Sequence, residues 1–199
     1  MDSIDFFHRE INEHRLVTAR TADQLGDAFK LALRIWTECV RQGGKILFFG
    51  NGGSAADAQH LSTELTIRYG EDRVALPGLA LTTDSSALTA CGNDLGFERI
   101  FERQIEALGK PGDVAFGIST SGRSENVVRA LKFAQSRRLR TIALTGGDGG
   151  LVKDHCDVAL IVPSQVTARI QEMHIMLGQM LCAGLEQELG MVPIRGGSP

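Results

Sequence analysis

The sequence has no long apolar run, no tract of like charge and little cysteine, and each absence excludes a class of protein. No stretch of its 199 residues is apolar over the length that spans a bilayer, so we expect no membrane-spanning helix. The N-terminus alternates acidic and basic residues and lacks the basic segment and apolar run of a secretory signal. A formal net charge of −3 gives no electrostatic footprint for nucleic acid or for an anionic membrane surface. We therefore expect a cytoplasmic protein that binds neither nucleic acid nor membrane.

Cysteine is too sparse and too widely spaced for a disulfide framework or a thiolate zinc site, because no C-x-x-C pair occurs. The pattern is typical of buried thiols in a reducing compartment. The four cysteines are Cys39, Cys91, Cys156 and Cys182. A chain of this length with 43% hydrophobic residues can bury one ordinary core. We predict a single domain with an N-terminal helical extension (1–42), an α/β core (43–190) and a tail (191–199).

Periodicity predicts helices alternating with short buried strands. Apolar residues recur at helical spacing from Ile4 to Gln42, which we interpret as two helices. Five short apolar runs follow, each leading into a turn and a mostly helical pattern: KILFFG, LALTT, DVAFGIS, TIALTG and VALIVP. This alternation predicts a parallel sheet with helices on both faces. A long final helix is predicted over 167–189, ended by Gly190 and Pro193.

The first loop of interest, GNGGSAAD (50–57), follows the first strand. It lacks the lysine of a nucleotide phosphate loop, and Ala55 stands where a dinucleotide fingerprint needs glycine. On this loop alone, a tight strand-to-helix turn is favoured slightly over a binding site.

The second loop, ISTSGRSEN (118–126), has a different composition. It places four hydroxyls around one glycine at the predicted start of a helix, from Ser119, Thr120, Ser121 and Ser124. Free backbone N–H groups and the helix dipole favour an anion there, and hydroxyls add neutral donors. Simple N-capping by one serine is the alternative, but four hydroxyls favour a phosphate monoester.

Polar residues also mark two of the predicted helices. His60 and Glu64 lie one turn apart, so they project from one face and could share a metal ion, move protons or form a simple hydrogen-bonded pair. The final helix is apolar except for a few side chains, which belong either to a site or to a subunit interface. These are Gln171, Glu172, His174 and Gln179.

Four motifs occur in the order typical of one family: GNGGSAADAQH, TAxGND (89–94), ISTSGxS and RIQEMHI. Over nearly the whole chain the sequence resembles the phosphoheptose isomerases, members of the sugar-isomerase (SIS) domain class. The resemblance implies a flavodoxin-like α/β fold and a homotetramer with active sites at subunit boundaries. It also implies conversion of sedoheptulose 7-phosphate to D-glycero-D-manno-heptose 7-phosphate, for the heptose of bacterial lipopolysaccharide.

The same resemblance implies roles for individual residues. Glu64 would be the base that moves a proton between C1 and C2 through an enediol. Zinc ligands would be His60, Glu64 and Gln171, the last from a neighbouring subunit, and the family's fourth ligand position is Gln179. Phosphate would be held by Ser119, Thr120, Ser121 and Ser124. Contacts to the sugar chain are expected from the remaining motif residues, namely Asn51, Gly52, Gly53, Ser54, Asp94 and Gln171.

The sequence departs from the family pattern at two positions. Gln179 stands where many members carry a histidine that serves as second acid/base group and metal ligand, and Ala168 replaces an aspartate. Glutamine has no proton to exchange near neutral pH, so we expect slow isomerisation and partial zinc occupancy or none. Two alternatives stay open: an isomerase of another sugar phosphate, and a non-catalytic binding protein like the relative that associates with the bacterial replication initiator. Retention of Glu64 favours an enzyme.

Overall fold

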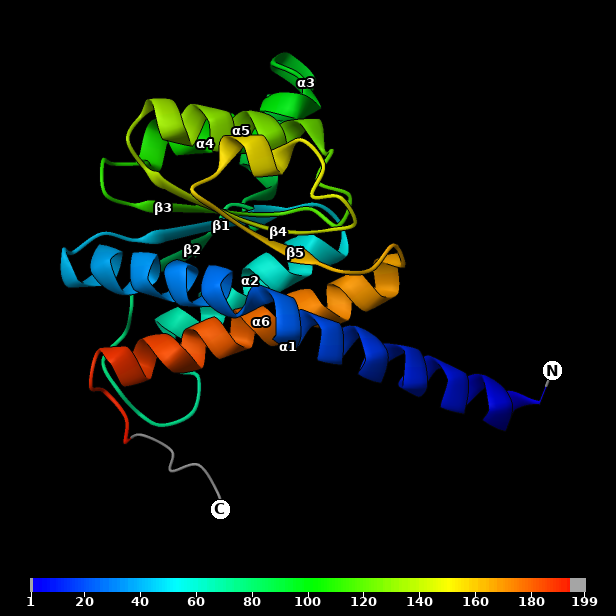
Figure 1. The fold of residues 1–199 in the computed structure, drawn as a ribbon. Coiled ribbons are helices and arrows are strands. Elements are labelled where there is room, and N and C mark those ends of the chain that lie inside the picture. The colour runs from blue at the N-terminus through cyan, green and yellow to red at the C-terminus, as the bar shows by residue number, and fades with distance from the viewer. Residues whose placement is uncertain (1, 194–199) are drawn as a thin grey trace.

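This computed structural model describes residues 2–193. Its centre is one parallel sheet of five strands (Figure 1). The strands are β1 (Ile46–Gly50), β2 (Gly78–Ala80), β3 (Val114–Ile118), β4 (Arg140–Gly146) and β5 (Val158–Val162). Their order, β2-β1-β3-β4-β5, is flavodoxin-like, as the resemblance implies. Strand β2 is shorter than its predicted run, because the chain turns away after one further bond, from the Leu81 N–H to the Phe48 carbonyl.

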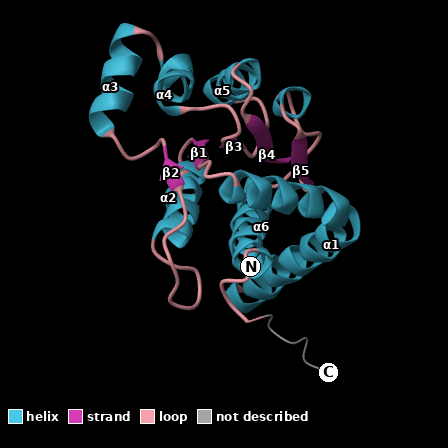
Figure 2. Ribbon diagram, turned by 90° about the vertical axis from the view of Figure 1, so that its left-hand side faces the viewer, coloured by secondary structure: helices cyan, strands magenta, loops and turns pink. Residues whose placement is uncertain are grey.

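Helices cover both faces of the sheet, and Figure 2 shows the two layers on either side of the strands. One layer contains α1 (Ser3–Arg41), α2 (Gly53–Thr66) and α6 (Thr167–Glu188). The other contains α3 (Ser85–Asp94), α4 (Ile100–Leu108) and α5 (Glu125–Ser136), with short 3-10 turns at Phe97–Arg99 and Val152–His155. The α/β class predicted from the sequence is therefore confirmed.

Alternating strand side chains build a separate core on each face. Phe48 and Phe116 point toward the α1 layer, where their rings lie 5.5 and 5.2 Å from the Trp36 ring. Leu47 and Phe49 point toward the α5 layer. Every residue of β1 and β3 is buried, as expected of strands that are covered on both faces.

The N-terminal segment forms one continuous helix, so the prediction of two helices was wrong. Asp2 caps α1 by accepting the Ile4 N–H at 3.0 Å. The segment contains no proline, and its one glycine, Gly26, lowers helix stability by only about 1 kcal/mol, too little to break a helix with a packed face. The helix ends where Gly43 adopts a left-handed conformation with φ of 76°.

The two halves of α1 have different surroundings. Ile35 and Trp36, in the C-terminal half, are buried in the core on the β5 side of the molecule. The N-terminal half projects beyond the sheet and its covering helices (Figure 1). Its apolar side chains, such as Phe6, Phe7 and Ile11, are exposed. The N-terminal half therefore presents an apolar surface that the rest of the chain does not cover.

Within residues 2–193, no helix is long and apolar enough to cross a membrane. The cysteines are unpaired, as their spacing predicts, and Cys39, Cys91 and Cys182 are buried. Most of the predicted tail, residues 194–199, lies outside the described part of the chain.

Candidate active site

The candidate site lies at the carboxyl ends of β1 and β3, where the strand order reverses. These two strands are neighbours whose final paired residues are Gly50 and Ile118. From there the chain enters α2 on one face of the sheet and α5 on the other. In open parallel sheets such a reversal leaves a crevice between the two loops, and ligands bind in it.

The serine loop, residues 118–126, brings hydroxyls and helix N–H groups together at the start of α5. Ser124 is the N-cap residue, but its hydroxyl lies 3.0 Å from the Ser119 hydroxyl, and it makes no capping bond to the helix. Gly122 bends the loop with φ of 63°, and the Ser121 hydroxyl accepts the Arg123 N–H at 3.2 Å. A first helical turn without a side-chain cap favours an anion. The geometry suits a phosphate, although phosphate binding itself stays a prediction.

A cavity of about 350 Å³ opens beside the serine loop. Its walls come from that loop, the glycine-rich loop after β4 and the start of α6, and comprise Thr120, Ser121, Arg123, Gly146, Gly147, Asp148, Gln165, Thr167 and Ile170. Arg123 supplies positive charge here, and its guanidinium donates to the Asp148 carboxylate at 2.6 Å. The Gly150 N–H, followed by the charge of Arg123, holds the pKa of Asp148 below its usual range. The cavity thus combines hydroxyls with a cation, a lining that suits a phosphorylated ligand.

The glycine turn between β1 and α2 lies on the opposite side of the crevice. Gly52 has φ of 56°, and α2 has no side-chain cap. A Cβ atom added at Gly53 would lie 2.5 Å from Nε2 of Gln171, so this amide lies directly against the turn. Ser54 is buried, and the Asn51 amide pairs with the Asn126 amide. The predicted residues 51–54 and Gln171 are therefore brought together.

His60, Glu64 and Gln179 converge further along α2. The His60 Nε2 atom lies 2.9 Å from Glu64 Oε1 and 3.1 Å from the Gln179 amide nitrogen. The imidazole is half-exposed, whereas the carboxylate of Glu64 is only 18% exposed. A shielded carboxylate with an imidazole and an amide beside it can accept and return a proton.

A buried ion pair fixes the end of α2 close to Glu64. Arg73 and Glu186 are almost fully buried and bond at 2.8 Å. The same guanidinium donates to the Glu64 and Leu65 carbonyls at the end of the helix, at 2.7 and 2.8 Å. Sequence reasoning missed this pair, because 113 residues separate its members.

One titratable group near these residues, Asp57, has a shifted pKa. Burial raises the pKa of the Asp57 carboxyl to about 6, against a smaller lowering effect from His60. Asp57 precedes His60 by three residues and Glu64 by seven, so the three share one face of α2. Sequence reasoning overlooked Asp57, which the spacing in DAQHLSTE could have indicated.

His174 belongs neither to the site nor to an exposed face. It is fully buried, and its Nε2 atom lies 3.1 Å from the Thr145 carbonyl oxygen. Burial lowers the pKa of this imidazole to about 4, so it is neutral at pH 7. Neither of the two options considered for the polar residues of the final helix, a site or a subunit interface, therefore applies to His174. Glu172 instead bonds His14 and Arg169, which ties α6 to α1.

The predicted zinc ligands are brought together only in part. No group of three or more His, Cys, Asp or Glu side chains in residues 2–193 could hold a metal ion. His60, Glu64 and Gln179 do converge, but Gln171 precedes Gln179 by eight residues on one helix, a separation of about 12 Å. That Gln171 comes from a neighbouring subunit stays a prediction.

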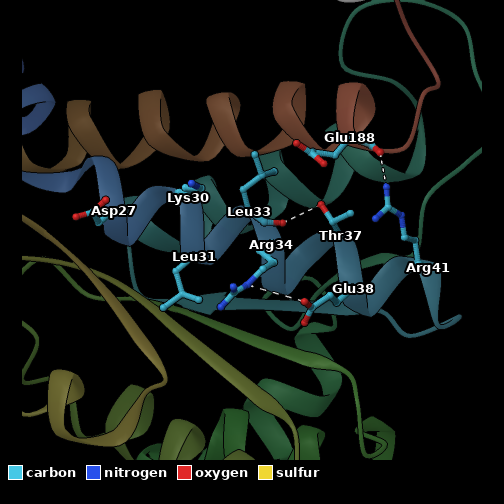
Figure 3. A pocket seen from close by; sticks show the side chains of 9 residues that line it. All are labelled: Asp27, Lys30, Leu31, Leu33, Arg34, Thr37, Glu38, Arg41 and Glu188. Atoms are coloured by element: carbon cyan, nitrogen blue, oxygen red, sulfur yellow. Dashed lines mark hydrogen bonds and ion pairs between the residues drawn. The ribbon is translucent and has the colours of Figure 1, made fainter.

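Asp94 is not brought to the crevice within this chain. It lies at the end of α3, where it bonds Asn93, in a separate cavity between α3 and α4. A further cavity of about 530 Å³ lies between α1 and the end of α6 (Figure 3). Within it Arg34 pairs with Glu38, and Arg41 donates to the Glu188 carbonyl. Neither cavity contains the serine loop or the His60 pair, so the crevice remains the candidate site.

Comparison with known proteins agrees with this geometry. A family model described as SIS domain matches residues 11–146. The phosphoheptose isomerase of Paramagnetospirillum magneticum is 54% identical over 91% of this chain and 94% of its own length. That of Aliarcobacter butzleri is 50% identical over 91% of this chain and 96% of its own.

Two solved structures of phosphoheptose isomerases are also similar to this chain. The phosphoheptose isomerase of Neisseria gonorrhoeae superposes with a TM-score of 0.88 at 43% identity, covering 94% of this chain and all of its own. That of Francisella tularensis gives 0.91 at 37% identity, with the same coverage of both chains. The fold and the crevice therefore define a SIS-domain protein. Within that class, the chain belongs to the phosphoheptose isomerase family.

Proposed function

We propose that the protein is an aldose–ketose isomerase that converts sedoheptulose 7-phosphate to D-glycero-D-manno-heptose 7-phosphate. The observation that carries the proposal is 54% identity to a phosphoheptose isomerase over 91% of the chain. The paired hydroxyls and uncapped helix of the serine loop, together with the carboxylate of Glu64, support it, because the reaction needs a phosphate grip and a base. The product would serve synthesis of lipopolysaccharide heptose, in the cytoplasm.

Substrate binding starts at the serine loop. The phosphate would accept hydrogen bonds from N–H groups of the first turn of α5 and from the hydroxyls of Ser119, Thr120, Ser121 and Ser124. Arg123 lies on the wall of the cavity beside the serine loop. Its guanidinium, which bonds the Asp148 carboxylate, would turn to the phosphate and add a charge-assisted donor. The sugar hydroxyls would contact residues 51–54 and Gln171, with Asp94 supplied by another subunit.

Glu64 is the proposed base. A single carboxylate can take a proton from one carbon and return it to the adjacent carbon, so Glu64 alone can carry the carbon chemistry through an enediol. A second group must serve the carbonyl and hydroxyl oxygens. Gln179 can only donate a fixed hydrogen bond there, which polarises the carbonyl without transferring a proton. We therefore infer a real but slow isomerase.

Zinc, if bound, would be held by His60, Glu64 and Gln179 together with Gln171 of a neighbouring subunit. A bound zinc ion supplies polarisation of the substrate carbonyl. Two members of this set are neutral amide oxygens, and one of them, Gln179, replaces the family's histidine, so we infer partial occupancy or none without added metal. The convergence of Glu64 and Gln179 on His60 Nε2 supports the placement.

Assembly into a homotetramer would complete the site. The apolar side chains along the first turns of α1 are exposed in the single chain, and association would bury them. The separation of Gln171 from Gln179 by about 12 Å along α6 supports sites shared between subunits.

The test is an isomerase assay of the purified protein with sedoheptulose 7-phosphate, with and without zinc. We expect slow formation of the aldose that zinc accelerates. No aldose under either condition, alongside normal binding of the sugar phosphate, would favour a non-catalytic SIS protein. Turnover of a different ketose phosphate alone would keep the reaction and change the substrate.

A further inference from the structure

Two asparagine amides form a reciprocal pair across the crevice. The Asn51 Nδ2 donates to Asn126 Oδ1 at 2.8 Å, and the Asn126 Nδ2 donates to Asn51 Oδ1 at 2.8 Å. Asn126 belongs to the first turn of α5 and is only 3% exposed, whereas Asn51 lies in the turn between β1 and α2. The pair therefore links the loops that leave β1 and β3.

The pair determines the orientation of the Asn51 amide. An amide group has two N–H donors and one oxygen with two lone pairs, and its two ends are nearly equal in size. Asn51 stands between Gly50 and Gly52, neither of which has a side chain to hold its amide. The reciprocal bonds fix one N–H and one lone pair, so the remaining N–H and lone pair have defined directions.

We propose that Asn126 is a positioning residue for the proposed isomerase. It acts without touching substrate: it fixes the Asn51 amide, which presents one donor and one acceptor to a sugar hydroxyl. It also holds the glycine turn of α2 in register with the phosphate-binding turn of α5. The inference rests on the proposed function and adds a residue to its site. If Asn126 had only a structural role, it would stabilise the fold, and its effect on activity would not depend on Asn51.

A double-mutant cycle separates the two roles. Asn126→Ala, Asn51→Ala and the double variant are assayed for kcat and KM with sedoheptulose 7-phosphate, with thermal unfolding measured in parallel. Misplacing a contact group by about 1 Å can lower rates up to roughly a hundredfold. We expect Asn126→Ala to lower kcat/KM about tenfold or more in the parent and by less than about twofold when Asn51 is already alanine. Equal losses in both backgrounds, or no loss in the parent, would overturn the proposal.

Two further variants serve as controls. Asn126→Asp keeps the size of the side chain but puts a carboxylate oxygen opposite the Asn51 oxygen, so it should lower kcat/KM even if the alanine variant folds poorly. Gln104→Ala removes an amide that donates to the Leu81 and Ile100 carbonyls on the α4 side, so it should leave kcat/KM unchanged. A loss for Gln104→Ala equal to that for Asn126→Asp would contradict a role specific to the pair.

A readout without turnover distinguishes failure of this inference from failure of the proposed function. The side-chain NH₂ signals of Asn51 in ¹⁵N-labelled protein should be well separated, because one proton is bonded within the pair. Asn126→Ala should bring the two proton signals together and accelerate their exchange with water. Unchanged Asn51 signals would overturn the inference even in an active enzyme, whereas changed signals in an inactive protein would refute only the reaction.

Discussion

Gly122→Ala should open the serine loop, and its cost can be worked from the structure. Gly122 has φ of 63°, a conformation that costs an alanine about 1–2 kcal/mol. A Cβ atom there would lie 2.2 Å from the Gly149 carbonyl oxygen, whereas carbon and oxygen ordinarily approach to about 3.3 Å. The serine loop and the glycine-rich loop must therefore separate by about 1 Å, at an overpacking cost of about 1–3 kcal/mol. The total loss of unfolding free energy is about 2–5 kcal/mol.

Urea denaturation and titration with sedoheptulose 7-phosphate test this prediction, with Gly43→Ala as the matched control. Gly43 also has a positive φ, 76°, but a Cβ atom there would meet no other atom within 4 Å. The control should lose only the conformational cost and keep its ligand affinity. Gly122→Ala should lose more stability and bind the sugar phosphate at least about tenfold more weakly, because the hydroxyls move. Equal destabilisation of both variants with unchanged affinity would refute the reasoning.

Three further predictions follow from the structure. Arg73→Met should lower the unfolding free energy by about 3–5 kcal/mol in urea, because Glu186 is left buried and unpaired, and Arg73→Met with Glu186→Leu should recover most of it. Burial lowers the pKa of His174 to about 4, against 6.5 in the unfolded chain, so below pH 6.5 the unfolded chain takes up a proton that the folded chain does not. The contribution of neutral His174 to the free energy of unfolding is therefore complete above pH 6.5 and is lost as pH falls toward 4. His174→Gln should flatten that dependence in thermal unfolding. Gln179→His should raise turnover up to about a hundredfold and increase zinc retained after dialysis, and unchanged values would contradict the assigned role.

The sequence was sufficient to predict the sheet and the serine loop. Short apolar runs such as that around Phe48 became strands because only a layer covered on both faces buries every residue of a run. The four hydroxyls of the serine loop are local in sequence, so their convergence at one helix start could be predicted from spacing. The final helix was equally clear, with its end marked by Gly190 and Pro193.

Features that depend on contacts between distant segments could not be predicted. Asn51 and Asn126 pair only because β1 and β3 are neighbours, which is a property of strand order. His174 looked like a functional side chain until the packing of α6 buried it. The continuity of α1 was missed because its packed face, and not local propensity, decides whether a helix tolerates Gly26.

The most direct test of the central claim follows proton exchange at the substrate carbons. Sedoheptulose 7-phosphate is incubated with the protein in D₂O, and deuterium at C1 and C2 is followed by NMR, for the parent and for Glu64→Gln. An enediol formed by Glu64 predicts deuterium incorporation by the parent and none by the variant, while both bind the sugar phosphate with similar affinity. Equal incorporation by both proteins, or neither deuterium nor aldose formed by the parent at saturating substrate with zinc, would contradict the account.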